Sequence, residues 1–426
     1  MKDKVSVPRT RRYICPSFFL PTIDSILRNA DSGTWFGDID LGEMFLNYML
    51  DENLLPWVGV DVSELGTSTG SFVVERWERT LMGLRPSPFV CTQSFGWSED
   101  VIRGDHHDAS NPLAWDKVIL NLPGNSDYDP TRPWVYRLNS ATGEMANFFG
   151  TYIDDIRTGG PTERDCHATS RRVASSVGYL GQQDAPRKRR FPHQRPGAWA
   201  GAMCFSLTSE GLYVTCSKEK WDKGKAIVEA LHQAVVVNDE NLLTRASLEK
   251  DVGFLVHLSR TFPALFPYFK GIYHTMESWR LGRNSDGWKF SKTAWWNLMA
   301  GAVVEDEDDE LRELPFDEAR RAFSRRHQAE QPAQVKPVGR LSNDLKALKK
   351  LFVKDNPPRR LVRGKSIKEA MFGFGDASGQ GFGASWEVRE GELYFRLGTW
   401  GEDMSSASSN LRELKNLVES LELMLP

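Results

Sequence analysis

The feature that most constrains this chain is a set of aspartates placed inside otherwise apolar segments. In Trp35–Leu41, Asp38 and Asp40 alternate with apolar residues. A period of two predicts a strand that carries both carboxylates on one face. A carboxylate inside an apolar strand is costly unless it is paired, hydrogen-bonded or bound to a metal. The segment therefore predicts a strand whose acids have specific partners.

A second acidic motif is the tetrapeptide Tyr152–Asp155, which ends in two adjacent aspartates. Phe148 and Phe149 precede it, and Gly159 and Gly160 follow, a pattern typical of a β-hairpin with the acids at its tip. Adjacent aspartates repel each other and favour a nearby cation, and a solvated surface turn is the alternative interpretation. With the strand acid, the pair would form a hard-oxygen site for two Mg²⁺ ions, with Mn²⁺ as a substitute, suited to in-line phosphoryl transfer. An unrelated two-metal phosphohydrolase is an alternative that the same acids allow.

Four segments, taken in order, resemble the reverse transcriptases of LTR- and DIRS-type retrotransposons. Phe19–Leu27 resembles the family's PLPxIDxLL segment, and Phe36–Phe45 resembles its motif A. Leu81–Phe89 is similar to motif B (LPxGLxxSP), and Tyr152–Asp155 is similar to motif C. The order of the segments and the 43 positions from Asp40 to Gly83 fit the family. Coincidence across four ordered motifs is improbable.

The resemblance implies that Asp40, and not Asp38, is the motif A catalytic aspartate, because the family's aromatic residue comes five positions later, where Phe45 stands. Asp154 and Asp155 would complete the catalytic and metal-binding set. Phe45 would stack under the incoming sugar and exclude a 2′-hydroxyl by size. The alternative for Phe45 is an ordinary core phenylalanine.

Three more substrate-binding residues are implied by the resemblance: Tyr152, Gly83 and Arg85. Gly83 would allow close backbone approach to the template–primer or the nucleotide. Arg85 would contact template phosphate, or would simply be solvated. Pro86 and Pro88 would fix the turn into a following helix.

The sequence departs from the family in three places. Arg157 follows the paired aspartates where the family has apolar residues, and only 39 residues precede Asp40, so the fingers segment looks truncated. The 71 positions from Gly83 to Asp154 include an apparent insertion at 105–133. That insertion contains Asp105–Asp108, whose two histidines between aspartates suggest a metal site or, more commonly, a polar loop.

Positive charge is concentrated in one run, Arg187, Lys188, Arg189 and Arg190. We expect it to bind a nucleic-acid backbone with salt-dependent affinity. In the family's order it falls in the motif D region, and a solvated loop or a localisation signal is the alternative. Net charge is close to zero, with 54 basic against 57 acidic residues, and gives no global support for a nucleic-acid partner.

Near the carboxyl end, residues 375–384 resemble the first strand and turn of retroelement RNase H (DASxxGWGA), which implies that Asp376 is a nuclease carboxylate. The segment Ser408–Leu414 is similar to the helix that carries the second one, so Glu413 would pair with Asp376. The active nuclease needs two further carboxylates, one on a later element, and 13 residues follow Glu413. RNase H activity is therefore expected to be absent.

The predicted architecture is α+β: a right-hand polymerase palm with an antiparallel sheet, a helical thumb or connection, and part of an RNase H-like fold. We expect partial fingers and palm at 1–215, helices at 216–325, a linker at 326–368 that includes a solvated connector, and the RNase H-like part at 369–426. The absence of a long apolar run, the absence of a leader and five scattered cysteines indicate an intracellular protein, cytoplasmic or nuclear, without membrane partners.

The implied function is RNA-directed DNA synthesis, with an RNA template, a DNA primer and dNTPs as partners. The alternative is an inactive or domesticated retroelement fragment that binds nucleic acid without synthesis.

Overall fold

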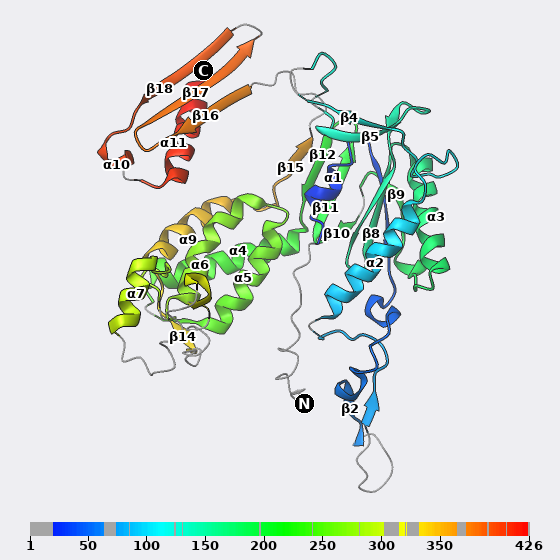
Figure 1. Cartoon of the computed structure of the whole chain (residues 1–426), viewed down its shortest axis with the longest axis horizontal. Coiled ribbons are helices and arrows are strands. Elements are labelled where there is room, and N and C mark those ends of the chain that lie inside the picture. The colour runs from blue at the N-terminus through cyan, green and yellow to red at the C-terminus, as the bar shows by residue number, and fades with distance from the viewer. Residues whose placement is uncertain are drawn as a thin grey trace. The chain divides into compact units, whose positions relative to one another are not determined.

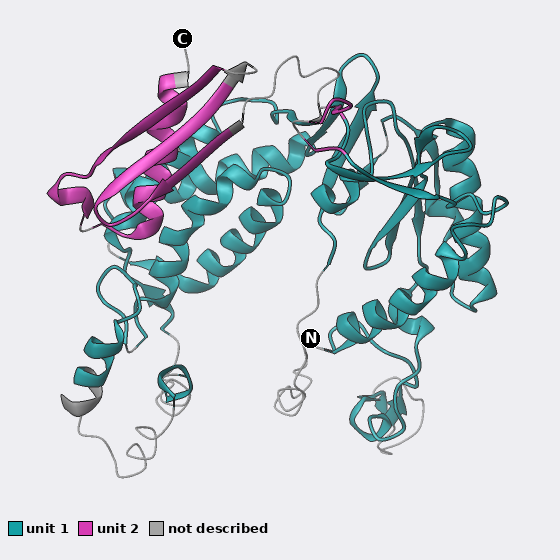
Figure 2. Cartoon of the chain, turned by 45° about the horizontal axis from the view of Figure 1, so that its top comes forward, with its two compact units in different colours: residues 1–120, 132–365 teal, residues 121–131, 366–426 magenta. Residues whose placement is uncertain are grey.

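The computed structural model describes residues 20–63, 74–84, 86–122, 125–129, 131–195, 197–240, 242–280, 282–301, 315–319, 321, 332–363, 372–389, 392–405 and 407–424. The chain forms two compact units: residues 1–120 with 132–365 (unit 1), and residues 121–131 with 366–426 (unit 2; Figure 2). Helices are combined with several small antiparallel sheets, so the α+β prediction is confirmed. Phe19, Arg85 and the acidic stretch 305–310 lie outside the described residues.

Unit 1 is built around a four-stranded antiparallel sheet in the order β7-β8-β1-β9. Its strands are β1 (Trp35–Asp40), β7 (Phe148–Tyr152), β8 (Asp155–Gly160) and β9 (Arg190–His193). The predicted strand and the predicted hairpin are both confirmed. Strand β9 comes from the basic run, for which no strand was predicted, and it pairs with β1 on the side opposite to β8.

Two helices pack beside this sheet, with α2 (Ser87–Arg103) against α3 (Glu163–Tyr179) and α3 against β1 and β8 (Figure 1). Helix α3 begins after Thr162, whose hydroxyl accepts a hydrogen bond from the Asp165 amide (3.2 Å). Helix α2 begins directly after Pro86 and carries Pro88 in its first turn. The predicted role of these prolines in starting a helix is confirmed, since proline tolerates only the first turn.

Side chains of β1 alternate between two cores. Ile39 lies in a cluster with Phe149 and with residues of α2 and α3, whereas Phe36 lies in a second cluster with Trp199. Asp38 and Asp40 share the face of Phe36, because alternate residues of a strand point the same way. The predicted single face for the two carboxylates follows from this arrangement.

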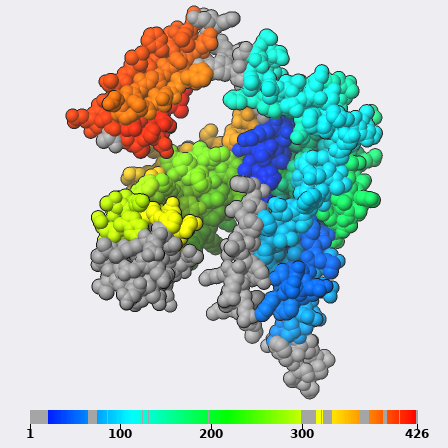
Figure 3. Space-filling model, in the orientation of Figure 1, coloured from blue at the N-terminus to red at the C-terminus, as the bar shows by residue number. Residues whose placement is uncertain are grey.

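The second cluster packs α1 (Ile23–Leu27) against another antiparallel sheet, whose strands in order are β10 (Ala198–Trp199), β11 (Ala202–Leu207), β12 (Gly211–Thr215) and β15 (Arg360–Arg363). Asp24 of α1 accepts a hydrogen bond from Arg360 Nη2 at 2.7 Å. In Figure 3 the blue surface of α1 accordingly lies next to the orange surface of β15. Segments from opposite ends of unit 1 thus close this core.

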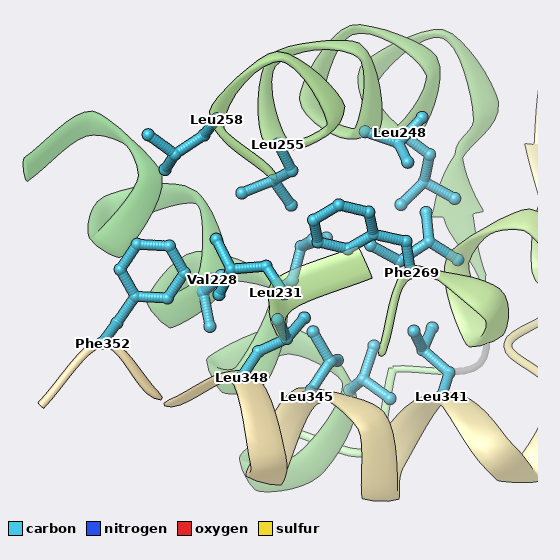
Figure 4. Packing of buried hydrophobic residues seen from close by; sticks show 14 of the residues in the cluster. Val228, Leu231, Leu248, Leu255, Leu258, Phe269, Leu341, Leu345, Leu348 and Phe352 are labelled. Carbon is cyan, nitrogen blue, oxygen red and sulfur yellow. The ribbon is translucent and has the colours of Figure 1, made fainter. Parts of the chain in front are cut away.

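A third core in unit 1 is helical (Figure 4). Its elements are α4 (Lys218–His232), the π-helical segment η6 (Gln233–Val237), α5 (Arg245–Ser259), the 3₁₀ helix η7 (Pro263–Phe269), α6 (Lys270–Glu277) and α9 (Gly339–Leu351). The predicted helical pattern after residue 217 is confirmed for α4 and α5. The segment 326–368, expected as a linker, contains regular elements: β14 (Gln334–Val335) pairs with β13 (Leu243–Thr244), and Leu341, Leu345 and Leu348 of α9 are fully buried.

Smaller elements complete unit 1. They are the 3₁₀ helices η2 (Met44–Asn47), η3 (Leu55–Trp57) and η5 (Pro186–Lys188), the hairpin of β2 (Gly59–Asp61) and β3 (Val74–Arg76), the sheet of β4 (Lys117–Leu120), β5 (Val135–Asn139) and β6 (Glu144–Met145), and helix α7 (Lys292–Gly301). The apparent insertion therefore contributes β4 and leads into a small sheet of its own. No helix in the described parts of either unit is long and apolar enough to cross a membrane.

Unit 2 contains an antiparallel sheet in the order β16 (Phe372–Ala377), β17 (Gly381–Arg389), β18 (Glu392–Thr399). The short helix α10 (Glu402–Ser405) follows, and α11 (Ser409–Met424) packs against β16 and β17. Asn416 of α11 is buried, and its Nδ2 donates to the carbonyls of Asp376 (3.0 Å) and Gly383 (2.8 Å). The first strand, the hairpin turn and the helix predicted for this segment are confirmed.

Candidate functional site

The register of the central sheet brings the predicted catalytic aspartates together. Asp40, the last residue of β1, is the pairing partner of Asp155, the first residue of β8. Asp154 lies in the two-residue turn between β7 and β8, and its carbonyl accepts a hydrogen bond from the Leu41 amide (2.8 Å). Three carboxylates from two distant parts of the sequence therefore lie at one end of the sheet.

The turn itself is strained. Ile153 has a φ of +55°, a backbone conformation that β-branched residues rarely adopt. Its side chain packs against the core that contains Phe149 and Ile156, and this packing holds the conformation. Strained residues of this kind occur often at functional sites, where the surrounding structure determines them.

Burial and mutual repulsion act on these acids. Burial is the main cause that raises the pKa of Asp155 to about 6, and the charges of Asp154, Asp40 and Asp38 raise it further, while Arg157 opposes them. Burial also raises the pKa of Asp154, and the Asp40 carboxylate adds to the effect. The negative charge at this end of the sheet is thus under-compensated, an environment that favours a cation.

Lys188 supplies one cation directly at the acids. Its Nζ donates to both carboxylate oxygens of Asp40, at 2.8 Å to Oδ1 and 3.0 Å to Oδ2. The lysine closes η5, the 3₁₀ helix that leads into β9. The sequence placed Lys188 among nucleic-acid-binding residues and gave no indication of this contact, because the pairing of β9 with β1 cannot be read from a basic run.

Arg157 supplies a second cation, and it is fully buried. Its guanidinium contacts Asp38 at two points, from Nε to Oδ1 (2.8 Å) and from Nη2 to Oδ2 (3.1 Å). Nη2 also donates to the Gly197 carbonyl at 3.0 Å, and the rings of Phe36 and Trp199 lie within 5.6 Å of the guanidinium carbon. The residue that departs from the family pattern therefore has a defined partner in the other aspartate of β1.

The implied nucleotide-contacting aromatics lie near the acids along the chain. Tyr152 is the last residue of β7 and pairs with Asp155 across the hairpin. Its ring packs edge-on against Trp199, and its hydroxyl accepts a hydrogen bond from Arg260. It also lines a pocket of about 270 Å³ with Leu20–Ile23, Ala200 and Arg260. A side chain at this place can contact a ligand that reaches the hairpin.

Phe45 lies in η2, directly after β1. It is partly buried against the core of Ile39 and Phe149, and its carbonyl accepts a hydrogen bond from the Thr80 hydroxyl. This packing agrees with the alternative of a core phenylalanine as far as the buried part of the ring is concerned. The exposed remainder leaves a contact with a nucleotide possible.

Gly83 lies in the loop before α2 with a φ of +94°, a conformation that favours glycine. A Cβ built there would meet no atom within 4 Å, so the backbone faces open space at this point. Arg85, two positions later, is outside the described residues.

The other members of the basic run are exposed. Arg189 forms an ion pair with Asp184, and Arg190 begins β9 opposite Asp38 in the sheet register. Arg187 is exposed at the middle of η5. The run is thus a segment that lines the edge of the acidic site, and its predicted contact with nucleic acid stays a prediction.

The remaining candidate residues belong to other elements of the chain. In the Asp105–Asp108 loop, His106 stacks on Trp115 (4.0 Å between ring centroids), and Asp108 accepts from Ser110, which favours the polar-loop interpretation. In unit 2, Glu413 accepts a hydrogen bond from Ser409 of its own helix, while Asp376 is exposed on β16. Their predicted pairing stays a prediction.

Comparison with known proteins finds similarity to solved structures. No family model and no curated protein matches the sequence. Among solved structures, a foamy viral protease–reverse transcriptase in complex with double-stranded DNA is similar, with a TM-score of 0.39, 10% identity, and coverage of 96% of this chain and 51% of that one. A foamy viral protease–reverse transcriptase in complex with an RNA/DNA hybrid is similar as well, with a TM-score of 0.39 and 11% identity. The match covers 95% of this chain and 39% of that one. The chain thus spans about half or less of the length of these proteins.

The chemistry of Asp40, Asp154 and Asp155 fits Mg²⁺, which prefers oxygen ligands and is held by carboxylates at phosphoryl-transfer sites. A divalent ion would also offset the mutual repulsion of these carboxylates. With the side chains as they stand, no three His, Cys, Asp or Glu residues of the described segments form a ready-made metal cluster. The carboxylate of Asp40 is instead engaged by Lys188.

Proposed function

We propose that this chain is an RNA-directed DNA polymerase of the retrotransposon type, with Asp40, Asp154 and Asp155 as its catalytic carboxylates. The observation that carries the proposal is the pairing of Asp40 with Asp155 across β1 and β8, with Asp154 in the adjoining turn. The ordered series of four sequence segments that resemble reverse transcriptases supports it independently.

In this proposal the three carboxylates hold two Mg²⁺ ions, or Mn²⁺ in their place. Such ions activate the 3′-hydroxyl of a primer and stabilise the pyrophosphate that leaves the dNTP. The protein's own contribution is placement: the sheet register fixes Asp40 against Asp155, and the Leu41–Asp154 hydrogen bond holds the turn at the end of β1. The RNA template and DNA primer would have to place the primer 3′-hydroxyl at these carboxylates.

Substrate selection would fall to residues next to the acids. Phe45 comes five positions after Asp40, in η2, and would contact the sugar of the incoming dNTP through the exposed part of its ring. Tyr152 would contact nucleotide or primer beside the hairpin, and Gly83 would let the template–primer approach the backbone before α2. These roles come from the family resemblance.

Replacement of Asp154 by Asn tests the proposal, because it removes one charge with little change in shape. We expect D154N to abolish primer extension on poly(rA)/oligo(dT) with Mg²⁺ or Mn²⁺ and to leave hybrid binding, measured by fluorescence anisotropy, nearly unchanged. The control is D108N, which removes an exposed loop carboxylate and should retain the parent's rate. Equal rates in D154N and the parent protein would refute the assignment.

One observation favours the second candidate, a fragment that binds nucleic acid without synthesis. Two of the aspartates at the site already have protein cations as partners, Asp40 with Lys188 and Asp38 with Arg157. A protein of this kind would bind the hybrid and fail to extend the primer with either metal. The same assay therefore separates the two functions.

A further inference from the structure

The geometry points to a role for Lys188 that goes beyond nucleic-acid binding: we infer that its ammonium group is an internal counter-ion of Asp40, which a divalent cation must displace in order to bind. This inference rests on the proposed function, because it concerns how the proposed metal site is filled. It makes Lys188 a residue that sets metal affinity.

The contact occupies the carboxylate that a metal would use. Lys188 Nζ lies within 3.0 Å of both carboxylate oxygens of Asp40, so the ammonium group donates hydrogen bonds to both at once. An ion that coordinates Asp40 competes with these hydrogen bonds and with the positive charge that makes them.

The backbone around Lys188 is fixed to the end of β1. The Ala185 amide donates to the Asp40 carbonyl (3.0 Å), and the Gly42 amide donates to the Gln183 carbonyl (2.8 Å). The segment that carries the lysine therefore stays beside the acids whether or not the ion pair is formed. The effective concentration of the ammonium at Asp40 is high for this reason.

The lysine side chain is nevertheless able to leave. It is 52% exposed, and Asp40 is the one ion-pair partner recorded for it among the described residues. Asp40 is mostly buried, but the ammonium group reaches it from the solvent side, so a divalent ion can replace the lysine without opening the core. Arg157 differs in each respect, since it is fully buried and held by Asp38, Cys204 and Gly197.

Mn²⁺ binding to the full chain, measured by the loss of the free-ion EPR signal, tests the inference without an activity readout. We expect K188M to bind Mn²⁺ about tenfold more tightly, the size expected for removing a unit charge roughly 6 Å from a divalent ion in water. K188R keeps the charge and should stay near the parent's affinity. The matched control is R189M, which removes the next residue of the basic run and breaks its ion pair with Asp184. We expect it to change Mn²⁺ affinity less than about twofold.

Because the ammonium also occupies the oxygens of Asp40, K188M should tighten binding less in a D40N background than in the parent background. Unchanged or weaker affinity in K188M, or an equal gain in R189M, overturns the counter-ion role. In those cases the proposed function survives if D154N and D40N still weaken Mn²⁺ binding. If the parent, K188M, D40N and D154N all bind alike, the metal site itself is wrong and the proposed function fails with it. Thermal unfolding midpoints of all variants check that each is folded.

Discussion

At the scale of single residues, Arg157 and Asp38 show how the structure explains a departure from the expected pattern. Arg157 stands where the reverse transcriptases that the sequence resembles have an apolar residue, yet it is buried and forms a two-point contact with Asp38. A buried charge is tolerated when it is paired and hydrogen-bonded. The pair spans β1 and β8, two register positions inward from the Asp40–Asp155 pair, and thus stabilises the strand register on which the site depends.

We predict that Arg157→Met lowers the free energy of unfolding by about 3–5 kcal/mol, because it leaves the mostly buried Asp38 carboxylate without a partner. The double substitution D38N/R157M should be less destabilised than the sum of the two single ones, since no unpaired charge is left. Urea unfolding followed by circular dichroism measures both. Strict additivity in this cycle would contradict a direct coupling between the two side chains.

At the scale of elements, α9 is a helix whose apolar spacing is present in the sequence, although the prolines and polar residues that precede it favour a linker. Leu341, Leu345 and Leu348 follow the spacing of an amphipathic helix, but Pro332, Pro337 and the polar residues around them favoured a connector. In the structure these leucines close the helical core against α4 and α6. The segment belongs to the fold that supports unit 1.

Truncation of one of these leucines tests that position. We predict that Leu345→Ala destabilises the protein by about 2–5 kcal/mol, the usual cost of a cavity at a fully buried leucine. Lys350→Ala, an exposed position of the same helix, should change stability by less than about 0.5 kcal/mol. The comparison uses urea midpoints, and a similar effect for the two variants would argue that α9 does not pack in the core.

The sequence was sufficient for elements with a strong local signal: β1, the β7–β8 hairpin, the start of α2, helices α4 and α5, and the first strand and final helix of unit 2. It was insufficient for pairings between distant segments. The Lys188–Asp40 contact depends on the pairing of β9 with β1 across 148 positions, and β9 has no alternation because it begins in a charged run. Packing and register at that distance are decided by the whole core, which local periodicity does not record.

At the scale of the whole molecule, charge is balanced locally and not only on average. The basic run contributes Lys188 to Asp40 and Arg189 to Asp184, so part of its charge is neutralised within the protein. A net charge near zero is therefore compatible with a concentrated acidic site beside a concentrated basic segment. Net charge alone neither supports nor excludes a nucleic-acid partner for such a chain.

The two units also differ in how much they bury. Unit 1 has three large apolar cores, whereas the described part of unit 2 buries two apolar residues, Ala377 and Trp386, and leaves Phe374, Phe395 and Leu397 largely exposed. Local stability follows such burial, so unit 2 should open more readily than unit 1. Hydrogen exchange can therefore report on each unit separately.

We predict that saturating Mg²⁺ slows amide exchange in peptides that cover β1 and the β7–β8 hairpin and leaves β16–β18 unchanged, because a ligand that binds the folded site stabilises only what it is coupled to. Peptides from unit 2 should exchange faster than those from the central sheet with or without the metal. D154N should lose the Mg²⁺-dependent protection at β1, since the effect requires the carboxylates at that end of the sheet. Equal protection of both units, or protection that persists in D154N, would mean that Mg²⁺ acts on the protein's charge as a whole and not at these three aspartates.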